Sequence, residues 1–186
     1  MQVSSVFSSD ISEVPRWYVL RDLKRANARE HACQLLQELQ MEVFTPMKWQ
    51  LVTVKGKHIR KEVPYMPDLL FVHDTRKHID PIVESCSTLQ YRWLRNKFRE
   101  PMTVPEADMN RFIQAVRSAE SPRYFLPEEI TSSMLGHPIR MIGGPLNGYE
   151  GTLLTVRDSK VKRLLVELPG LLTVGVEVDP DYIQFV

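Results

Sequence analysis

The stretch Ile-Arg-Met-Ile-Gly-Gly-Pro-Leu-Asn-Gly-Tyr-Glu-Gly, residues 139–151, decides the fold of the C-terminal part of the chain. Its four glycines and one proline lie between two apolar runs, a pattern typical of a tight corner between short β-strands rather than of a helix. Asn147 and Gly148 both tolerate a positive φ, so this pair predicts a tight hairpin or bulge. We therefore expect residues 139–151 to fold as a hairpin of a small β-barrel.

Short extended segments continue on the C-terminal side of this hairpin. Turn signals such as Pro169-Gly170 separate them, and short strands at this density favour a small, partly open barrel. The expected strands cover residues 139–142, 151–156, 164–168, 172–178 and 182–185. Because Pro169 and Gly170 would break any helix in the Leu- and Val-rich segment around them, a β-barrel is the expected resting state of residues 132–186.

The sequence before residue 118 has a different pattern, in which helical and extended segments alternate. The run Trp17-Tyr18-Val19-Leu20 predicts a buried strand, and Asn27 with Glu30 resembles the capping box of a helix over 28–40. A helix opened by Pro105 would bury Met109, Phe112, Ile113 and Val116. Further strands are expected at 42–46, 49–55, 59–63, 69–72 and 91–94, and a helix at 79–86 in which Pro81 is acceptable only in the first turn.

These patterns predict an α+β chain of two domains. The first is an α/β sandwich with a mainly antiparallel sheet at residues 16–117, and the second is the β-barrel at 132–186. Residues 1–15 are polar and end at Pro15, which predicts a disordered tail. Ser121, Pro122 and Pro127 interrupt the periodicity of residues 118–131, where we place the linker between the domains.

Composition and motifs exclude several classes of function. No apolar run is long enough to span a membrane, and residues 1–12 lack the features of an export signal, so we expect a cytoplasmic protein. Cys33 and Cys86 form no CxxC pair and no cluster with histidine, so neither a metal site nor a cofactor is expected. The sequence lacks the P-loop, GxSxG and HExxH motifs, which argues against an enzyme.

Basic charge is concentrated in the first two thirds of the chain. Residues 16–62 carry ten Lys or Arg against five Asp or Glu, and residues 76–99 carry six against two. Residues 100–131 reverse the sign, with three basic and six acidic side chains. A nucleic-acid-binding face is therefore to be sought in the first domain, provided that several basic side chains converge there.

Three features together resemble the NusG family. They are the strand Trp17-Tyr18-Val19-Leu20, the segment Pro67 to Val72 that leads into a central strand, and the glycine-rich hairpin Gly143 to Gly151. The resemblance covers about residues 16–186 and implies an N-terminal NGN domain joined to a C-terminal SH3-like KOW barrel. It implies a transcription elongation or antitermination factor that suppresses pausing or termination.

The sequence is more similar to specialised, operon-restricted members of this family, including those that serve polysaccharide loci, than to the general factor. Lys24-Arg25 after the first strand, Thr45-Pro46-Met47 after the second and Leu70-Phe71-Val72 in the central strand carry this similarity.

The resemblance implies that the NGN domain binds the β′ clamp helices of RNA polymerase. The family uses an apolar patch near a Phe-Pro-Gly-Tyr motif, which corresponds here to Met66, Pro67, Asp68 and Leu69. Two aromatic residues are thus replaced by Met and Leu, so the patch stays apolar. The candidate polymerase-binding residues are Tyr65, Met66, Pro67, Leu69, Phe71 and Trp17. Of these, Trp17 and Phe71 are also typical core residues, and the loop residues Tyr65 and Met66 are the better candidates for contact.

Basic residues after the first strand and on the first helix contact the non-template DNA strand in specialised relatives. The candidate DNA-binding residues here are Lys24, Arg25, Arg29, His31, Arg92 and Arg95. For Arg29 and His31, a solvated helix face explains the sequence equally well. Phosphate contacts by such residues would make binding salt-dependent.

The resemblance further implies that the KOW domain recruits a ribosomal protein, a termination factor or RNA. The candidate partner-binding residues are Ile142, Leu146, Tyr149, Leu171 and Leu172, to which Val174 can be added, and barrel core is the competing interpretation for most of them. A monomer is expected. The alternative to a polymerase-binding factor is a ribosome-associated or RNA-binding KOW protein, which would also be basic and noncatalytic.

Overall fold

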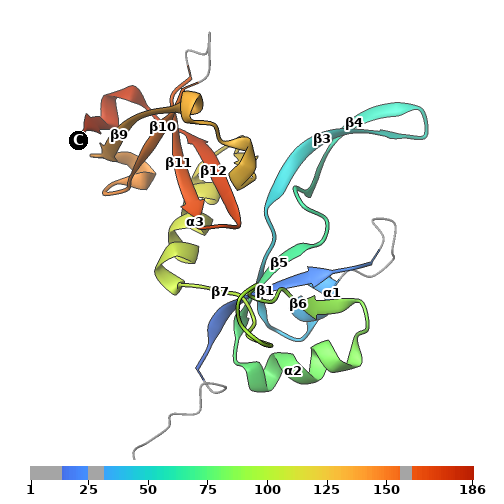
Figure 1. The fold of residues 1–186 in the computed structure, drawn as a ribbon. Coiled ribbons are helices and arrows are strands. Elements are labelled where there is room, and N and C mark those ends of the chain that lie inside the picture. Colours follow the sequence, from blue (N-terminus) through green and yellow to red (C-terminus); the bar gives the residue numbers. More distant parts are fainter. Residues whose placement is uncertain (1–13, 25–31, 156–160) are drawn as a thin grey trace, which may run out of the picture. The chain divides into compact units, whose positions relative to one another are not determined.

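The computed structural model describes residues 14–24, 32–155 and 161–186, and they belong to two compact units (Figure 1). The first unit comprises the chain up to Thr45 together with Met66–Pro105. The second comprises Pro46–Tyr65 and Glu106–Val186. The chain therefore passes between the units more than once.

The first unit is built on a five-stranded antiparallel sheet in the order β2-β5-β1-β6, with β7 also paired to β1. The strands are β1 (Arg16–Asp22), β2 (Glu42–Phe44), β5 (Leu69–Asp74), β6 (Leu89–Tyr91) and β7 (Thr103–Val104). Tyr18 lies opposite Val72 and Leu20 opposite Leu70, and all four side chains are buried. Both apolar runs form buried strands, as expected, and the structure pairs them with each other in the middle of the sheet.

Two helices cover one face of this sheet. Leu36 of α1 (Ala32–Glu38) and Ile79 of α2 (Arg76–Ser85) share a core cluster with Tyr18, Leu20 and other buried residues. The expected start of the first helix, at residue 28, lies outside the described residues. The expectation for Pro81 was wrong. Pro81 lies in the second turn of α2, because the helix begins at Arg76, and it removes one helical N–H donor.

Strands β3 (Met47–Val54) and β4 (Lys57–Pro64) form a separate two-stranded hairpin within the second unit. Lys55 and Gly56 connect them with φ values of 49° and 76°. Two central residues with positive φ are the signature of a type I′ turn, whose twist matches that of the flanking strands. The hairpin expected from residues 49–63 is therefore confirmed, with both strands longer than expected.

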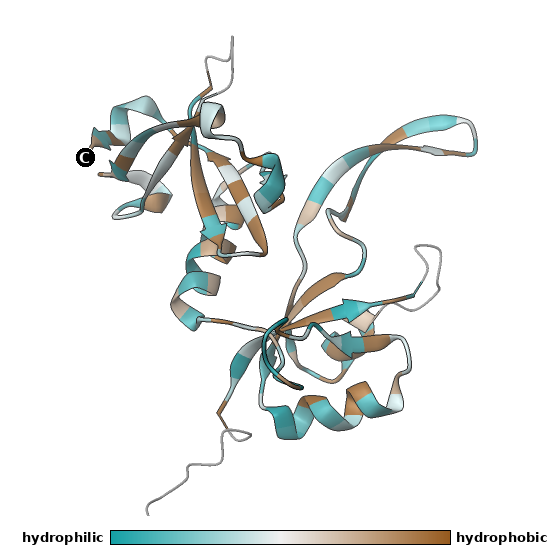
Figure 2. Ribbon diagram, viewed as in Figure 1, coloured by the Kyte–Doolittle hydropathy of each residue, from teal (hydrophilic) through white to brown (hydrophobic). Residues whose placement is uncertain are grey.

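The rest of the second unit is a six-stranded antiparallel sheet in the order β13-β9-β10-β11-β12-β8. Its strands are β8 (Arg123–Phe125), β9 (Leu135–Met141), β10 (Glu150–Leu154), β11 (Arg163–Leu168), β12 (Leu172–Glu177) and β13 (Ile183–Phe185). Apolar residues are concentrated along β11 and β12 in Figure 2. The five strands expected after residue 138 are present, and an all-antiparallel sheet accounts for residues 135–185, as expected.

Two elements of the second unit lie outside residues 132–186, the expected second domain. Strand β8 lies in the segment expected to be a linker, pairs with β12 and buries Tyr124. Helix α3 (Glu106–Ser118) belongs to the second unit, where it packs against β11 and β12. Met109, Phe112 and Ile113 are buried as expected, but Ala115 rather than Val116 completes the buried face.

The fold class is thus α+β, with an N-terminal mixed region of helices and sheet and a C-terminal antiparallel sheet. Among the described helices, none has both the length and the apolar character needed to cross a membrane.

Candidate functional site

The loop that leads into β5 is fixed by backbone hydrogen bonds. The N–H of Leu69 donates to the carbonyl of Met66 at 3.2 Å, and the N–H of Asp22 donates to the carbonyl of Asp68 at 3.0 Å. Within the first unit, Met66 is half-buried and Pro67 is exposed. This loop therefore presents an apolar pair of side chains on a backbone that is tied to the central strand β1.

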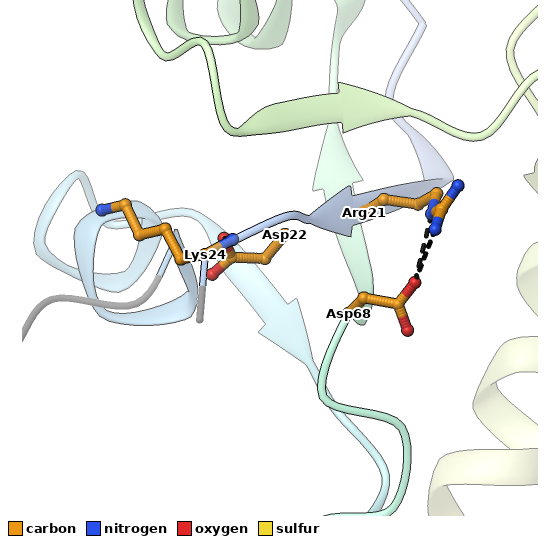
Figure 3. Close-up of polar contacts among 4 residues, drawn as sticks. All are labelled: Arg21, Asp22, Lys24 and Asp68. Atoms are coloured by element: carbon orange, nitrogen blue, oxygen red, sulfur yellow. Dashed lines mark hydrogen bonds and ion pairs between the residues drawn. The ribbon is translucent and has the colours of Figure 1, made fainter. Parts of the chain in front are cut away.

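An ion pair adds a second connection between this loop and β1. Figure 3 shows Arg21 and Asp68 pointing toward each other, and Arg21 Nη2 lies 3.0 Å from Asp68 Oδ2. Arg21 Nε also donates to the same oxygen at 3.1 Å. Both side chains are substantially exposed, so the pair contributes roughly 0–1 kcal/mol to stability. The pair therefore connects Asp68 to Arg21 of β1 and adds little to stability.

Three of the candidate polymerase-binding residues lie in the core instead of on a surface. Trp17, Leu69 and Phe71 are all buried. The Trp17 ring stacks on His73 with 5.0 Å between centroids, and Phe71 lies 6.2 Å from Phe44. These three side chains are therefore covered in this structure, whereas Met66 is half-buried and Pro67 is exposed.

Tyr65, next to Met66 in sequence, belongs to the second unit. Its hydroxyl donates to Glu129 Oε2 at 3.2 Å, its ring lies 5.1 Å from Tyr124, and Lys48 Nζ lies 5.2 Å from its centroid. Burial, followed by the nearby Glu129 carboxylate, raises the pKa of the Tyr65 hydroxyl. The contacts of Tyr65 are therefore distinct from those of Met66 and Pro67.

A buried carboxylate, at the last residue of β1, accepts two backbone hydrogen bonds. Asp22 accepts hydrogen bonds from the backbone N–H of Lys24 at 3.0 Å and of Ala32 at 2.8 Å. In Figure 3 the Lys24 side chain points away from Arg21. The other three candidates on this segment, Arg25, Arg29 and His31, lie outside the described residues.

The remaining two basic candidates come from the segment after β6. Arg92 is half-buried and its N–H donates to the carbonyl of Val19 at 2.8 Å, whereas Arg95 is exposed. Val19 lies within β1, whereas Lys24 follows the end of this strand at Asp22. The antiparallel pairing of β1 and β6 therefore leads Arg92 away from Lys24.

In the second unit, the glycine-rich corner forms a type II turn. Tyr149 N–H donates to the carbonyl of Leu146 at 3.0 Å, with φ of −51° at Asn147 and of 82° at Gly148. Only Gly148 of the expected pair has a positive φ. At Gly143, whose backbone is extended, an added Cβ would lie 2.5 Å from the ring of Tyr182. Close packing therefore explains Gly143, and backbone conformation explains Gly148.

Most of the candidate partner-binding residues of this sheet are buried. Leu146, Tyr149, Leu171 and Leu172 are buried, whereas Ile142 is 54% exposed. The Tyr149 hydroxyl donates to Gln114 Oε1 of α3 at 2.8 Å and lies 3.2 Å from the Arg111 carbonyl. Burial raises its pKa. Of these five residues, Ile142 is the one that the structure presents to a partner.

Polar contacts fasten α3 around Tyr149. The Arg111 guanidinium lies 5.2 Å from the Tyr149 ring centroid and donates to the carbonyl of Glu150 at 3.1 Å. Gln114 donates to the carbonyl of Pro145 at 3.0 Å. These hydrogen bonds join Arg111 and Gln114, two exposed residues of α3, to the corner between β9 and β10.

The roles of Arg21 and Asp22 were not predicted from the sequence. Arg21 forms an ion pair with the loop residue Asp68, and Asp22 accepts backbone hydrogen bonds from Lys24 and Ala32. Asp22 bonds to a residue ten positions later, so no short-range motif could reveal its role. Arg21 and Asp68 are 47 residues apart. Among the residues that the structure describes, no group of three or more His, Cys, Asp or Glu side chains could hold a metal ion.

Comparison with known proteins identifies the family. The family model described as "Transcription termination factor nusG" matches residues 15–113, more than half of the chain. The chain therefore belongs to the NusG family of transcription factors, which are non-enzymatic. A solved structure titled "Domain interaction in Thermotoga maritima NusG" aligns with 92% of this chain and 97% of that chain, at 12% sequence identity and a TM-score of 0.46. No curated protein sequence matches the chain.

Proposed function

We propose that this protein is a transcription elongation and antitermination factor that binds the β′ clamp helices of RNA polymerase. Membership of the NusG family supports polymerase as the partner. The observation that carries the choice of surface is the loop before β5, where half-buried Met66 and exposed Pro67 stand on a backbone fixed by hydrogen bonds to β1 and within the loop. A pre-ordered apolar surface loses little entropy when it binds.

The candidate residues divide into two roles under this proposal. Met66 and Pro67 contact the polymerase, with Tyr65 as an additional contact from the second unit. Trp17, Leu69 and Phe71 would stabilise the strands that flank the loop, because their side chains are buried. Contact energy concentrated in a few central residues is common in protein interfaces.

The basic residues and the second unit would supply further contacts. Lys24, with Arg25, Arg29 and His31, would bind the non-template DNA strand, and Arg92 and Arg95 would form a separate, weaker contact. The sheet of β8 to β13 would act as a KOW domain that recruits a ribosomal protein, a termination factor or RNA, with Ile142 at the contact. The work is done by binding alone, which holds polymerase in a pause-resistant conformation. We assign the protein to the specialised, operon-restricted members of the family.

A single substitution tests the docking surface. Met66→Glu places a charge on the proposed apolar contact, and Gln90→Glu places the same charge on an exposed residue of β6. Leu69→Glu is unsuitable because Leu69 is 2% exposed and its replacement would unfold the domain. We expect Met66→Glu to weaken binding to purified core RNA polymerase at least tenfold and Gln90→Glu to leave it unchanged.

The alternative function has its own outcome in the same experiment. If the wild-type protein sediments with ribosomes and does not bind core polymerase, the ribosome-associated function is correct. If polymerase binds both variants equally, the loop is not the contact. A pausing assay then measures function, since Met66→Glu should abolish any reduction in pause duration that the wild-type protein produces.

A further inference from the structure

The β3–β4 hairpin concentrates the positive charge of the protein. Residues 47–64 contain five of the 24 Lys and Arg residues and one of the 23 Asp and Glu residues, so this segment has a charge of +4 in a chain whose net charge is +1. All other residues together therefore carry a charge of −3. Neither the polymerase-binding loop nor the candidate DNA-binding residues include any of these five basic side chains.

The strand register places these charges on more than one side of the hairpin. Because opposed residues of an antiparallel pair share a face, Lys57 and Lys61 lie on one face, opposite Val54 and Gln50. Arg60 lies on the other face, opposite Leu51. Lys55 is in the turn at the tip. The four basic groups thus surround the outer half of the hairpin.

These side chains are accessible. Every residue from Lys57 to Glu62 is exposed, and so are the tip residues. Leu51 is 71% exposed, and Val54 and Ile59 are also exposed. A two-stranded hairpin with solvent on both faces is only marginally stable by itself, and its apolar residues gain from being covered. The hairpin therefore has the properties of a surface that is completed by a polyanionic partner.

We propose that the β3–β4 hairpin binds double-stranded DNA, with its outer half in the major groove. The groove of B-form DNA is about 12 Å wide and admits a two-stranded β-ribbon. Phosphates then lie on both sides of the ribbon, so that Lys57 and Lys61 on one face and Arg60 on the other can each reach a backbone. Lys57 and Lys61 are four residues apart, about 13 Å along the strand, which corresponds to roughly four base pairs.

Duplex DNA fits these features better than single strands or folded RNA. Proteins that bind single strands offer aromatic side chains on which bases stack. Trp49 is the one Trp, Tyr or Phe of residues 47–64, and the guanidinium of Arg60 lies 4.8 Å from its ring centroid, where it occupies one ring face. The other ring, the imidazole of His58, is hydrogen-bonded to the Thr53 hydroxyl at 3.2 Å. The major groove of an RNA duplex is too deep and narrow for side chains to read. The aliphatic residues on the lysine-bearing face can contact sugars and thymine methyl groups.

Salt-dependent binding of the 186-residue chain to bare DNA tests this proposal without polymerase. Fluorescence anisotropy would follow binding to a 20-base-pair duplex between roughly 25 and 200 mM salt. The hairpin variant carries Lys57→Gln, Arg60→Gln and Lys61→Gln. The matched control carries Lys77→Gln, Arg117→Gln and Lys162→Gln, three exposed basic residues outside the hairpin that change the net charge equally. A third variant, Lys57→Arg with Lys61→Arg, keeps the charge.

We expect the hairpin variant to bind at least tenfold more weakly at low salt. Its plot of log K against log salt should be shallower by about 2.7, because each lost phosphate contact removes about 0.9 from the slope. The control and the charge-preserving variant should bind within about twofold of the wild type, since the contact is with phosphates. An equal loss in the control variant, or tighter binding of the wild type to a single strand or an RNA stem-loop than to the duplex, would overturn the proposal. So would the absence of duplex binding by the wild type.

Discussion

Asp22 Oδ2 accepts a hydrogen bond from the backbone N–H of Ala32 at 2.8 Å, and this bond ties the end of β1 to the first residue of α1. The other carboxylate oxygen accepts the N–H of Lys24 at 3.0 Å. One buried side chain therefore holds the backbone of Lys24 and of Ala32. These two residues lie on either side of the segment that contains the basic candidates Arg25, Arg29 and His31.

Replacing Asp22 should destabilise the first unit. Asp22→Ala leaves two backbone N–H groups without their acceptor, and we expect the free energy of unfolding to fall by about 2–3 kcal/mol. Asp68→Ala, which removes an exposed ion pair with Arg21, should cost less than about 1 kcal/mol. Urea denaturation of both variants measures the difference. Equal losses would mean that the Asp22 bonds do not persist in solution.

Two glycines of the corner should respond differently to alanine. Gly143→Ala should destabilise the second unit by about 1–3 kcal/mol because its Cβ meets the Tyr182 ring. Gly148→Ala meets no atom within 4 Å, and its φ of 82° makes it costly by about 1 kcal/mol through the backbone alone. A Tyr182→Ala background separates the two causes. It should relieve the Gly143 substitution and leave the Gly148 substitution unchanged, as thermal denaturation of both glycine variants in the two backgrounds, with Tyr182→Ala alone as the reference, would report.

Stability should decline at alkaline pH through Tyr124. Burial raises the pKa of this hydroxyl from its ordinary value of 10.0 to about 12. The folded state therefore favours the neutral form, and the stabilisation that is complete below pH 10 is lost as the pH rises toward 12. Tyr124→Phe should flatten the decline of the urea midpoint measured between pH 9 and 11, relative to wild type. If the two curves stay parallel, the Tyr124 hydroxyl is accessible to water in solution.

Helix α3 should be needed for a stable second unit. Its buried face of Met109, Phe112 and Ile113 covers β11 and β12, so a fragment of residues 106–186 should unfold cooperatively and at a higher denaturant concentration than one of residues 119–186. Within the full chain, Phe112→Ala should cost about 3–5 kcal/mol, whereas the exposed Arg117→Ala should change stability by less than about 0.5 kcal/mol. Equal stability of the two fragments would place the domain boundary at residue 118, as expected from the sequence.

The sequence predicted elements whose residues carry a strong local pattern. Trp17 to Leu20, Leu69 to Val72 and the strands after residue 138 are runs of apolar or β-branched residues, and all form strands. Strand β8 was missed because Arg123-Tyr124-Phe125 is short and lies between prolines. It exists through pairing with β12, a partner about fifty residues away. Helix α2 begins before its apolar residues, at Arg76, which forms an i,i+4 ion pair with Asp80 at 3.0 Å.

The candidate site was predictable as a segment but not as a surface. The motif position at Met66 to Leu69 was found from the sequence, yet nothing in the residue types distinguishes half-exposed Met66 from buried Leu69. The strand expected at 69–72 does begin at Leu69, as β5 does, but the assignment of a strand alone does not show that the Leu69 side chain is covered. In the same way, Ile142 and Leu146 are similar side chains, and the turn between them exposes one and buries the other.

At the tip of the hairpin, the charge of Lys55 and the backbone conformation of the turn favour different residue types. Lys55 has a φ of 49° and occupies a position of a type I′ turn that Asn or Gly would fill with less strain. A lysine there sacrifices some stability of the turn and adds a cation at the outermost point of the molecule's most basic segment. Replacing Lys55 by Asn or Gly should therefore stabilise the turn. The same replacement should weaken the binding of the hairpin to an anionic partner, because it removes a positive charge.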